Sequence, residues 1–143
     1  MADLTITRVF DAPRELVFEL WTRPEHMAGW YGPIGLTTPL SSISMDVRPG
    51  GTWRATMVND ADGTEYPQGG TYQEVVAPER LVFTWGEPDD PARQALVTVM
   101  LAEAGGKTTM TFLITNLPDD LRESVNEGWT SAFESLANYL ETK

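Results

Sequence analysis

The sequence predicts an α+β fold in which a curved antiparallel sheet of seven strands wraps around a long C-terminal helix. Two patterns lead to this expectation. Runs of about eight residues with alternating polar and apolar side chains extend from Leu36 to Thr115, and Gly, Pro and Asp separate them. After Pro118 the apolar residues recur at three- and four-residue steps, which is the spacing of an amphipathic helix.

The N-terminal part is expected to hold one strand and two short helices. Residues 5–10 alternate polar and apolar side chains and include β-branched residues, as a half-buried strand does. Pro13 suits the first turn of a helix, and residues 16–21 supply its apolar face. Pro24 ends that helix and opens a second, shorter one over residues 26–30.

Six further strands are expected in the middle of the chain. Turn-forming residues at 49–51, 60–63 and 105–106 separate several of them. The glycine pairs Gly50-Gly51 and Gly69-Gly70 permit bulges and sharp coiling of the strands that contain them. The predicted strands cover residues 37–47, 51–58, 66–76, 80–86, 94–102 and 107–115.

The predicted C-terminal helix is about 30 Å long at 1.5 Å per residue, so it must lie across the sheet. One helix covers only a stripe of a strongly twisted sheet, and large side chains or a ligand must fill the remaining space. Tryptophan suits the wall of such a cavity because its apolar ring carries one N–H that needs a partner. The expected wall residues are Trp30, Trp53, Met57, Tyr72, Trp85, Trp129 and Phe133, and a plain core role is an equally good interpretation for each.

Composition and charge argue against several classes of function. Ten Lys and Arg against twenty-one Asp and Glu give a net charge of −11, which disfavours binding to nucleic acid or anionic membranes. The absence of Cys and the single His exclude thiolate metal sites and histidine clusters, so we expect no metal and no cofactor. The N-terminus lacks a secretion signal pattern, and no apolar run reaches the roughly 20 residues of a membrane span. We therefore expect a cytoplasmic protein without membrane insertion.

Three residues are weak candidates for acid–base catalysis: His26, Tyr72 and Glu74. By alternation Glu74 shares a strand face with Tyr72, and a carboxyl in an apolar cavity would have a raised pKa. Alternatively, a bulge near Gly69-Gly70 shifts this parity, and Glu74 then faces water or pairs with Arg80. His26 lies in a short polar segment, which is typical of a solvent-facing residue. The standard hydrolase, dinucleotide-binding and zinc-protease motifs do not occur in the sequence.

Seven segments carry a resemblance that covers nearly the whole chain. They are residues 8–13 (RVFDAP), 20–25 (LWTRPE), 29–33 (GWYGP), 46–53 (DVRPGGTW), 70–75 (GTYQEV) and 78–85 (PERLVFTW), and Gly128-Trp129 followed by Leu136 and Leu140. In this order they resemble the SRPBCC (START-like) superfamily, and within it the group named after the activator of Hsp90 ATPase. The resemblance implies one domain over residues 1–143 with a helix-grip (START/Bet v 1-like) fold and a deep cavity between sheet and helix.

The resemblance leaves three functions open, because the superfamily includes lipid and hormone binders, polyketide cyclases and co-chaperone domains. Our leading hypothesis is a protein that binds a small hydrophobic molecule of unknown identity in the cavity. The alternatives are a co-chaperone-type interaction module with a chaperone partner, and a cyclase- or dehydratase-like enzyme that uses the same cavity. The acidic segment 87–91 is either a solvated loop or a rim that favours neutral or cationic ligands. An exposed strand edge is compatible with a homodimer.

Overall fold

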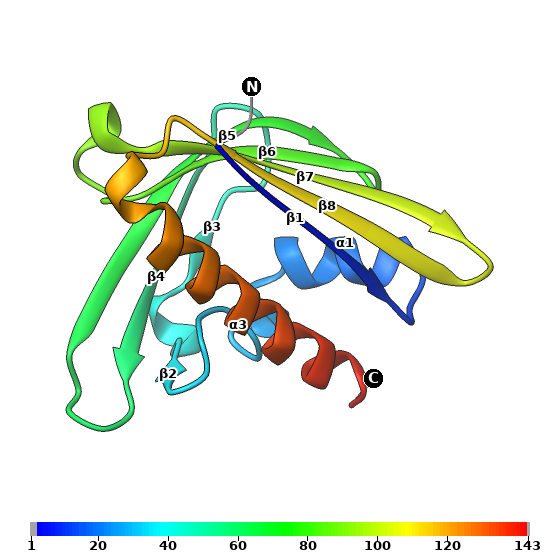
Figure 1. The fold of residues 1–143 in the computed structure, drawn as a ribbon, viewed down its shortest axis with the longest axis horizontal. Coiled ribbons are helices and arrows are strands. Elements are labelled where there is room, and N and C mark those ends of the chain that lie inside the picture. Colours follow the sequence, from blue (N-terminus) through cyan, green and yellow to red (C-terminus); the bar gives the residue numbers. More distant parts are fainter. Residues whose placement is uncertain (1–2, 143) are drawn as a thin grey trace.

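The protein, seen in a computed structural model that describes residues 3–142, is a curved antiparallel sheet gripping one long helix (Figure 1). The described strands are β1 (Leu4–Phe10), β2 (Leu36–Thr37), β3 (Ser44–Met45), β4 (Thr52–Asn59), β5 (Glu65–Val76), β6 (Arg80–Trp85), β7 (Ala95–Ala104) and β8 (Lys107–Thr115). They pair in the order β1-β8-β7-β6-β5-β4-β2, and β3 pairs with β4. The helices are α1 (Arg14–Thr22), α2 (Pro24–Met27) and α3 (Arg122–Leu140). The predicted helix-grip architecture is confirmed.

The strand expected over residues 37–47 is divided in two. A short 3-10 turn, Leu40–Ser42, separates β2 from β3 and follows Pro39, which has no N–H for a strand ladder. The Ser42 hydroxyl secures this turn, because it donates to the Pro39 carbonyl at 2.7 Å and accepts from the Thr56 N–H at 3.1 Å. The described sheet therefore has eight strands, where the alternation predicts seven.

Strand β5 bends at its glycine pair. It pairs with β4 as far as Thr71 and with β6 from Tyr72 onward. A side chain at Gly70 would place its Cβ 1.9 Å from the Thr84 carbonyl oxygen, so only glycine allows this close crossing. The β4–β5 hairpin consequently swings away from the rest of the sheet, as the green arm in Figure 1 shows, and forms one side of the site described below.

Aromatic side chains fill the centre of the curved sheet. Trp21 of α1 is 2% exposed and lies at the middle of this cluster. Its ring centroid is between 4.8 and 6.1 Å from those of Trp30, Phe83, Phe112, Trp129 and Phe133. The protein's own side chains thus occupy most of the interior, and open space remains near the N-terminal end of α3.

Candidate functional site

A cavity of about 170 Å³, which we call the inner chamber, lies under the first three turns of α3. Three parts of the chain form it: the loop after α2, the strands around the β5 bend, and α3 itself. Its lining residues are Tyr31, Gly32, Pro33, Met57, Gln68, Trp85, Ser124, Val125, Gly128, Trp129 and Ala132. Most of these side chains are apolar, so the chamber suits the apolar part of a small molecule.

The loop wall is held in place from both sides. Gly32 has φ +113°, a conformation that favours glycine, and a Cβ there would lie 2.9 Å from the Met57 sulfur. The Tyr31 carbonyl accepts a hydrogen bond from the buried Thr38 hydroxyl at 2.7 Å, and the Ile34 N–H donates to the Ser131 hydroxyl on α3 at 2.9 Å. These bonds fix the direction in which Tyr31 enters the chamber.

Three polar side chains meet on the chamber wall. The Trp85 Nε1–H lies 2.9 Å from Gln68 Oε1 and 3.1 Å from Tyr31 Oη. The Tyr31 hydroxyl donates a hydrogen bond to the same Gln68 oxygen. Burial raises the pKa of the Tyr31 phenol, and the Trp85 hydrogen bond offsets only part of this effect. Tyr31 therefore stays protonated and keeps its role as donor at neutral pH.

Gly128 leaves room in the helical wall. It is an interior residue of the 19-residue α3, where glycine costs about 1 kcal/mol relative to alanine. Among the described residues outside the α3 backbone and the adjoining positions, an added Cβ would contact only Pro33 Cγ, at 3.8 Å. Nothing in the packing of the described residues therefore requires glycine here, and its effect is to leave the chamber wider.

A second, more open space of about 650 Å³, the outer chamber, adjoins the inner one. Gln68, Trp85 and Val125 line both, so these three residues form the junction between them. The charged lining residues of the outer chamber are Glu65, Glu87 and Arg93. Glu87 belongs to the acidic segment 87–91, which therefore contributes to the rim of the site.

The predicted wall residues are distributed over the chamber and the core. Met57, Trp85 and Trp129 line the inner chamber. Trp53 and Tyr72 face a void of only about 10 Å³ beside Trp21, and Phe133 is fully buried in the aromatic cluster. Trp30 lines a separate groove between α2, β2 and α3 and donates its Nε1–H to the Leu20 carbonyl at 2.8 Å.

Sequence reasoning did not single out Tyr31 or Gln68 as wall residues. Tyr31 lies within residues 29–33, which carry part of the family resemblance, but the sequence of this segment does not show that its side chain lines a cavity. Gln68 precedes the glycine pair in a strand region of exposed residues, and no pattern in the sequence marks it. Its position on the wall follows from the bend of β5.

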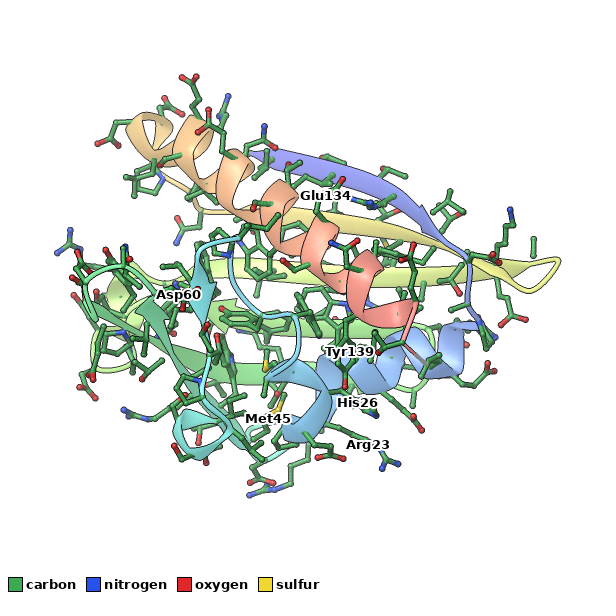
Figure 2. The ribbon with its side chains drawn as sticks, turned by 90° about the horizontal axis from the view of Figure 1, so that it is seen from below. Arg23, His26, Met45, Asp60, Glu134 and Tyr139 are labelled. Carbon is green, nitrogen blue, oxygen red and sulfur yellow. The ribbon has the colours of Figure 1, made fainter. Side chains whose placement is uncertain are left out.

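The three candidate catalytic residues lie outside the inner chamber. A register shift between Tyr72 and Glu74 turns Tyr72 into the core and Glu74 to the surface, where it pairs with Arg80 at 3.2 Å. His26 Nδ1 lies 2.9 Å from the Tyr139 hydroxyl of α3, and Figure 2 shows the two side chains directed toward each other. Burial also raises the pKa of Tyr72.

Residues 3–142 contain neither a cluster of metal-ligating side chains nor a helix suited to crossing a membrane. No group of three or more His, Asp or Glu side chains in this part of the chain is placed to hold a metal ion. None of its helices combines the length and the apolar character that crossing a bilayer requires. The lining of the inner chamber includes neither a carboxyl nor an imidazole group from these residues.

Comparison with known proteins gives the family. The family described as Activator of Hsp90 ATPase homolog 1-like protein matches residues 11–141. The chain belongs to this family. None of the curated proteins matches the sequence significantly.

Solved structures of Activator of Hsp90 ATPase homolog 1-like and related proteins share the fold over nearly the full chain. The AHSA1 protein from Silicibacter pomeroyi is 30% identical, with a TM-score of 0.86 over 99% of both chains. A protein from Chromobacterium violaceum is 26% identical, with a TM-score of 0.84 over 94% of both chains. A protein from Nitrosomonas europaea is 25% identical, with a TM-score of 0.84 over 99% of this chain and 95% of its own. The predicted family resemblance is thereby confirmed.

Proposed function

We propose that this protein binds a small hydrophobic molecule in the inner chamber between the sheet and α3. The observation that carries the proposal is an apolar cavity of about 170 Å³ that the fold leaves open although aromatic side chains fill the rest of the interior. A cavity of about 150 Å³ with apolar walls is large enough for benzene. The chamber therefore has the size of a single ring.

Gly128 supports the same proposal. An alanine there would improve helix propensity without meeting any atom closer than 3.8 Å, so protein stability alone favours a larger residue. A requirement for space beside Trp129 and Ala132 explains why a less stabilising residue occupies this position. The polar junction of Gln68 and Trp85 then provides the small number of fixed polar contacts that orient a ligand in a mostly apolar site.

A thermal-shift screen with a matched pair of variants tests the proposal. The panel covers single-ring aromatics, fatty acids, flavonoids, aromatic polyketides and sterols. A ligand at 100 times its Kd adds about 2.7 kcal/mol, which corresponds to about 9 °C in Tm for a chain of 143 residues. Gly128→Leu fills the chamber from α3, whereas Asn126→Leu adds the same side chain at an exposed position of the same helix.

We expect at least one panel member to raise the Tm of the wild type and of Asn126→Leu. The same compound is expected to leave the Tm of Gly128→Leu unchanged. A shift that survives Gly128→Leu would place binding elsewhere. A flat response of the wild type across the whole panel would contradict ligand binding in this chamber.

A co-chaperone-type role is the second candidate, and the family description favours it. The outer chamber is bordered by Tyr66 and Leu121, which are 43% and 45% exposed and offer apolar contacts to another protein. A pull-down with the Hsp90 homologue of the source cell tests this role. Retention that persists in Gly128→Leu and disappears on Tyr66→Ser would favour a protein partner at the outer chamber over a small ligand in the inner one.

A further inference from the structure

We propose that the ligand is a neutral ring compound with a hydrogen-bond acceptor such as a carbonyl oxygen, and that the Gln68 side-chain amide donates to that acceptor. This inference rests on the proposed function and specifies the ligand class for the same chamber. It depends on the hydrogen bonds of the wall, on the charges at the junction and on the size of the cavity.

The orientation of the Gln68 amide follows from its neighbours. A tryptophan Nε1–H only donates, so the Gln68 atom 2.9 Å from Trp85 Nε1 must be the oxygen. The Tyr31 hydroxyl donates to this oxygen too. The amide therefore presents its NH₂ group in the other direction, and no group among residues 3–142 accepts a hydrogen bond from Nε2. Gln68 is only half-buried and lines both chambers, so a ligand at their junction can contact this side chain.

The other side-chain N–H and O–H groups of the inner wall are unavailable to a ligand. The Tyr31 hydroxyl is committed to Gln68, the Trp85 N–H is shared by Gln68 and Tyr31, and the Ser124 hydroxyl donates to the Leu121 carbonyl at 3.1 Å. Trp129 Nε1 has no acceptor among the described residues, but its nitrogen is sealed from any water-sized group. The Gln68 amide is thus the side-chain donor that a ligand can reach, and it calls for an acceptor.

The charges around the junction favour a neutral molecule. Two carboxylates, Glu65 and Glu87, and one guanidinium, Arg93, line the outer chamber. The Arg93 side chain lies 4.0 Å from the Asp90 carboxylate, which offsets part of its charge. In a protein of net charge −11, an anion at the junction would meet unfavourable electrostatic potential from these acids. A carbonyl, ether or hydroxyl oxygen satisfies the Gln68 donor without that penalty.

Two probes of nearly equal shape isolate the hydrogen bond. Acetophenone carries a carbonyl oxygen where α-methylstyrene carries a methylene group, and both have one ring. Benzoate serves as the anionic analogue. The variant Gln68→Glu keeps an acceptor for Trp85 and Tyr31 and replaces the NH₂ donor by oxygen. Gln73→Glu introduces the same change at an exposed position of the same strand and serves as the control for added charge.

Affinities are measured by titration of ¹H–¹⁵N spectra, in which the Gln68 NH₂ pair is identified by its absence in Gln68→Glu. A neutral hydrogen bond is worth roughly a 2- to 12-fold change in Kd. We therefore expect the preference for acetophenone over α-methylstyrene to fall about 2- to 12-fold in Gln68→Glu and to stay unchanged in Gln73→Glu. The Gln68 NH₂ resonances are expected to move with acetophenone and not with α-methylstyrene, and benzoate is expected to bind more weakly than acetophenone.

The outcomes separate the two proposals. If both neutral probes bind and the preference is the same in the wild type and Gln68→Glu, the chamber binds ligands but the Gln68 donor does not select them, and this inference is wrong. Benzoate binding more tightly than acetophenone would also overturn it. If neither neutral probe binds at concentrations up to its solubility while a larger panel member binds, the protein binds a ligand but not the ring compound that the Gln68 amide is expected to select, and this inference is wrong. If no compound binds, the proposed function and this inference fail together.

Discussion

Replacing Gly128 by alanine should stabilise the protein, and the expected size follows from the structure. Glycine in a helix interior costs about 0.8–1.0 kcal/mol relative to alanine. Among the described residues, and apart from the backbone of α3 and the adjoining residues, the new Cβ would have Pro33 Cγ as its one neighbour within 4 Å, at an ordinary contact distance of 3.8 Å. Gly128 is half-buried, so the added methyl group also removes a little apolar surface from water. We expect the free energy of unfolding to rise by about 1 kcal/mol. For 143 residues this corresponds to an increase of about 3 °C in Tm.

Urea denaturation followed by far-ultraviolet circular dichroism measures the effect, and calorimetry provides the Tm. The control is Asn126→Ala, an exposed position on the same helix, for which propensity alone predicts a gain of up to about 0.7 kcal/mol. A stabilised control together with an unchanged or destabilised Gly128→Ala would refute our reasoning. In that case the space beside Gly128 would be occupied by something that a methyl group displaces, and the glycine would be part of the packing.

Three further predictions concern two buried tyrosines, a close contact at Gly29 and a surface ion pair. Burial raises the pKa of Tyr31 and Tyr72, so the unfolded chain loses these protons at lower pH than the folded protein does. The free energy of unfolding should therefore fall as pH rises above about 10. Tyr72→Phe should make this fall less steep, as measured by denaturation at pH 9 to 12. Gly29→Ala should lower the free energy of unfolding by about 1–3 kcal/mol, because the Cβ of the alanine would lie 2.2 Å from Tyr139 Cε1. In a Tyr139→Ala background the same change should cost much less, and equal costs would contradict the clash. Glu74→Gln should change the unfolding free energy by less than about 1 kcal/mol, since the ion pair of Glu74 with Arg80 is exposed. A larger loss of unfolding free energy, or a loss of ligand affinity, would give Glu74 a role that its surface position does not explain.

Most of the helices and strands were predictable because they have a strong local signal in the sequence. Turn formers such as Gly105-Gly106 lie between β7 and β8 as expected, and the three- and four-residue spacing after Pro118 matches α3. The division of the strand expected over residues 37–47 was missed because the turn Leu40–Ser42 contains no Gly or Asp to mark it, while the missing N–H of Pro39 interrupts pairing.

The site was only partly predictable, because the direction of a side chain depends on strand register, and its place in the interior depends on the packing of distant elements. Alternation placed Trp53 and Met57 on the inner face correctly, and both are buried. The same rule fails across the register shift between Tyr72 and Glu74, since one extra residue reverses which face a strand presents. Trp21 lay on a predicted apolar helix face, but no local pattern shows that its ring occupies the centre of the interior.

The position of Trp21 also limits the size of the ligand that we propose for the inner chamber. Its ring fills the space between α1 and the middle of α3, so a ligand cannot extend deeper than Trp129 without displacing the aromatic cluster. An inner chamber of about 170 Å³ holds about one ring, and a larger ligand must pass the junction at Gln68 and Trp85 into the outer chamber. A fused-ring compound such as a sterol would therefore bind with one end inside, and its polar group would have to lie one ring away from that end to meet the Gln68 amide.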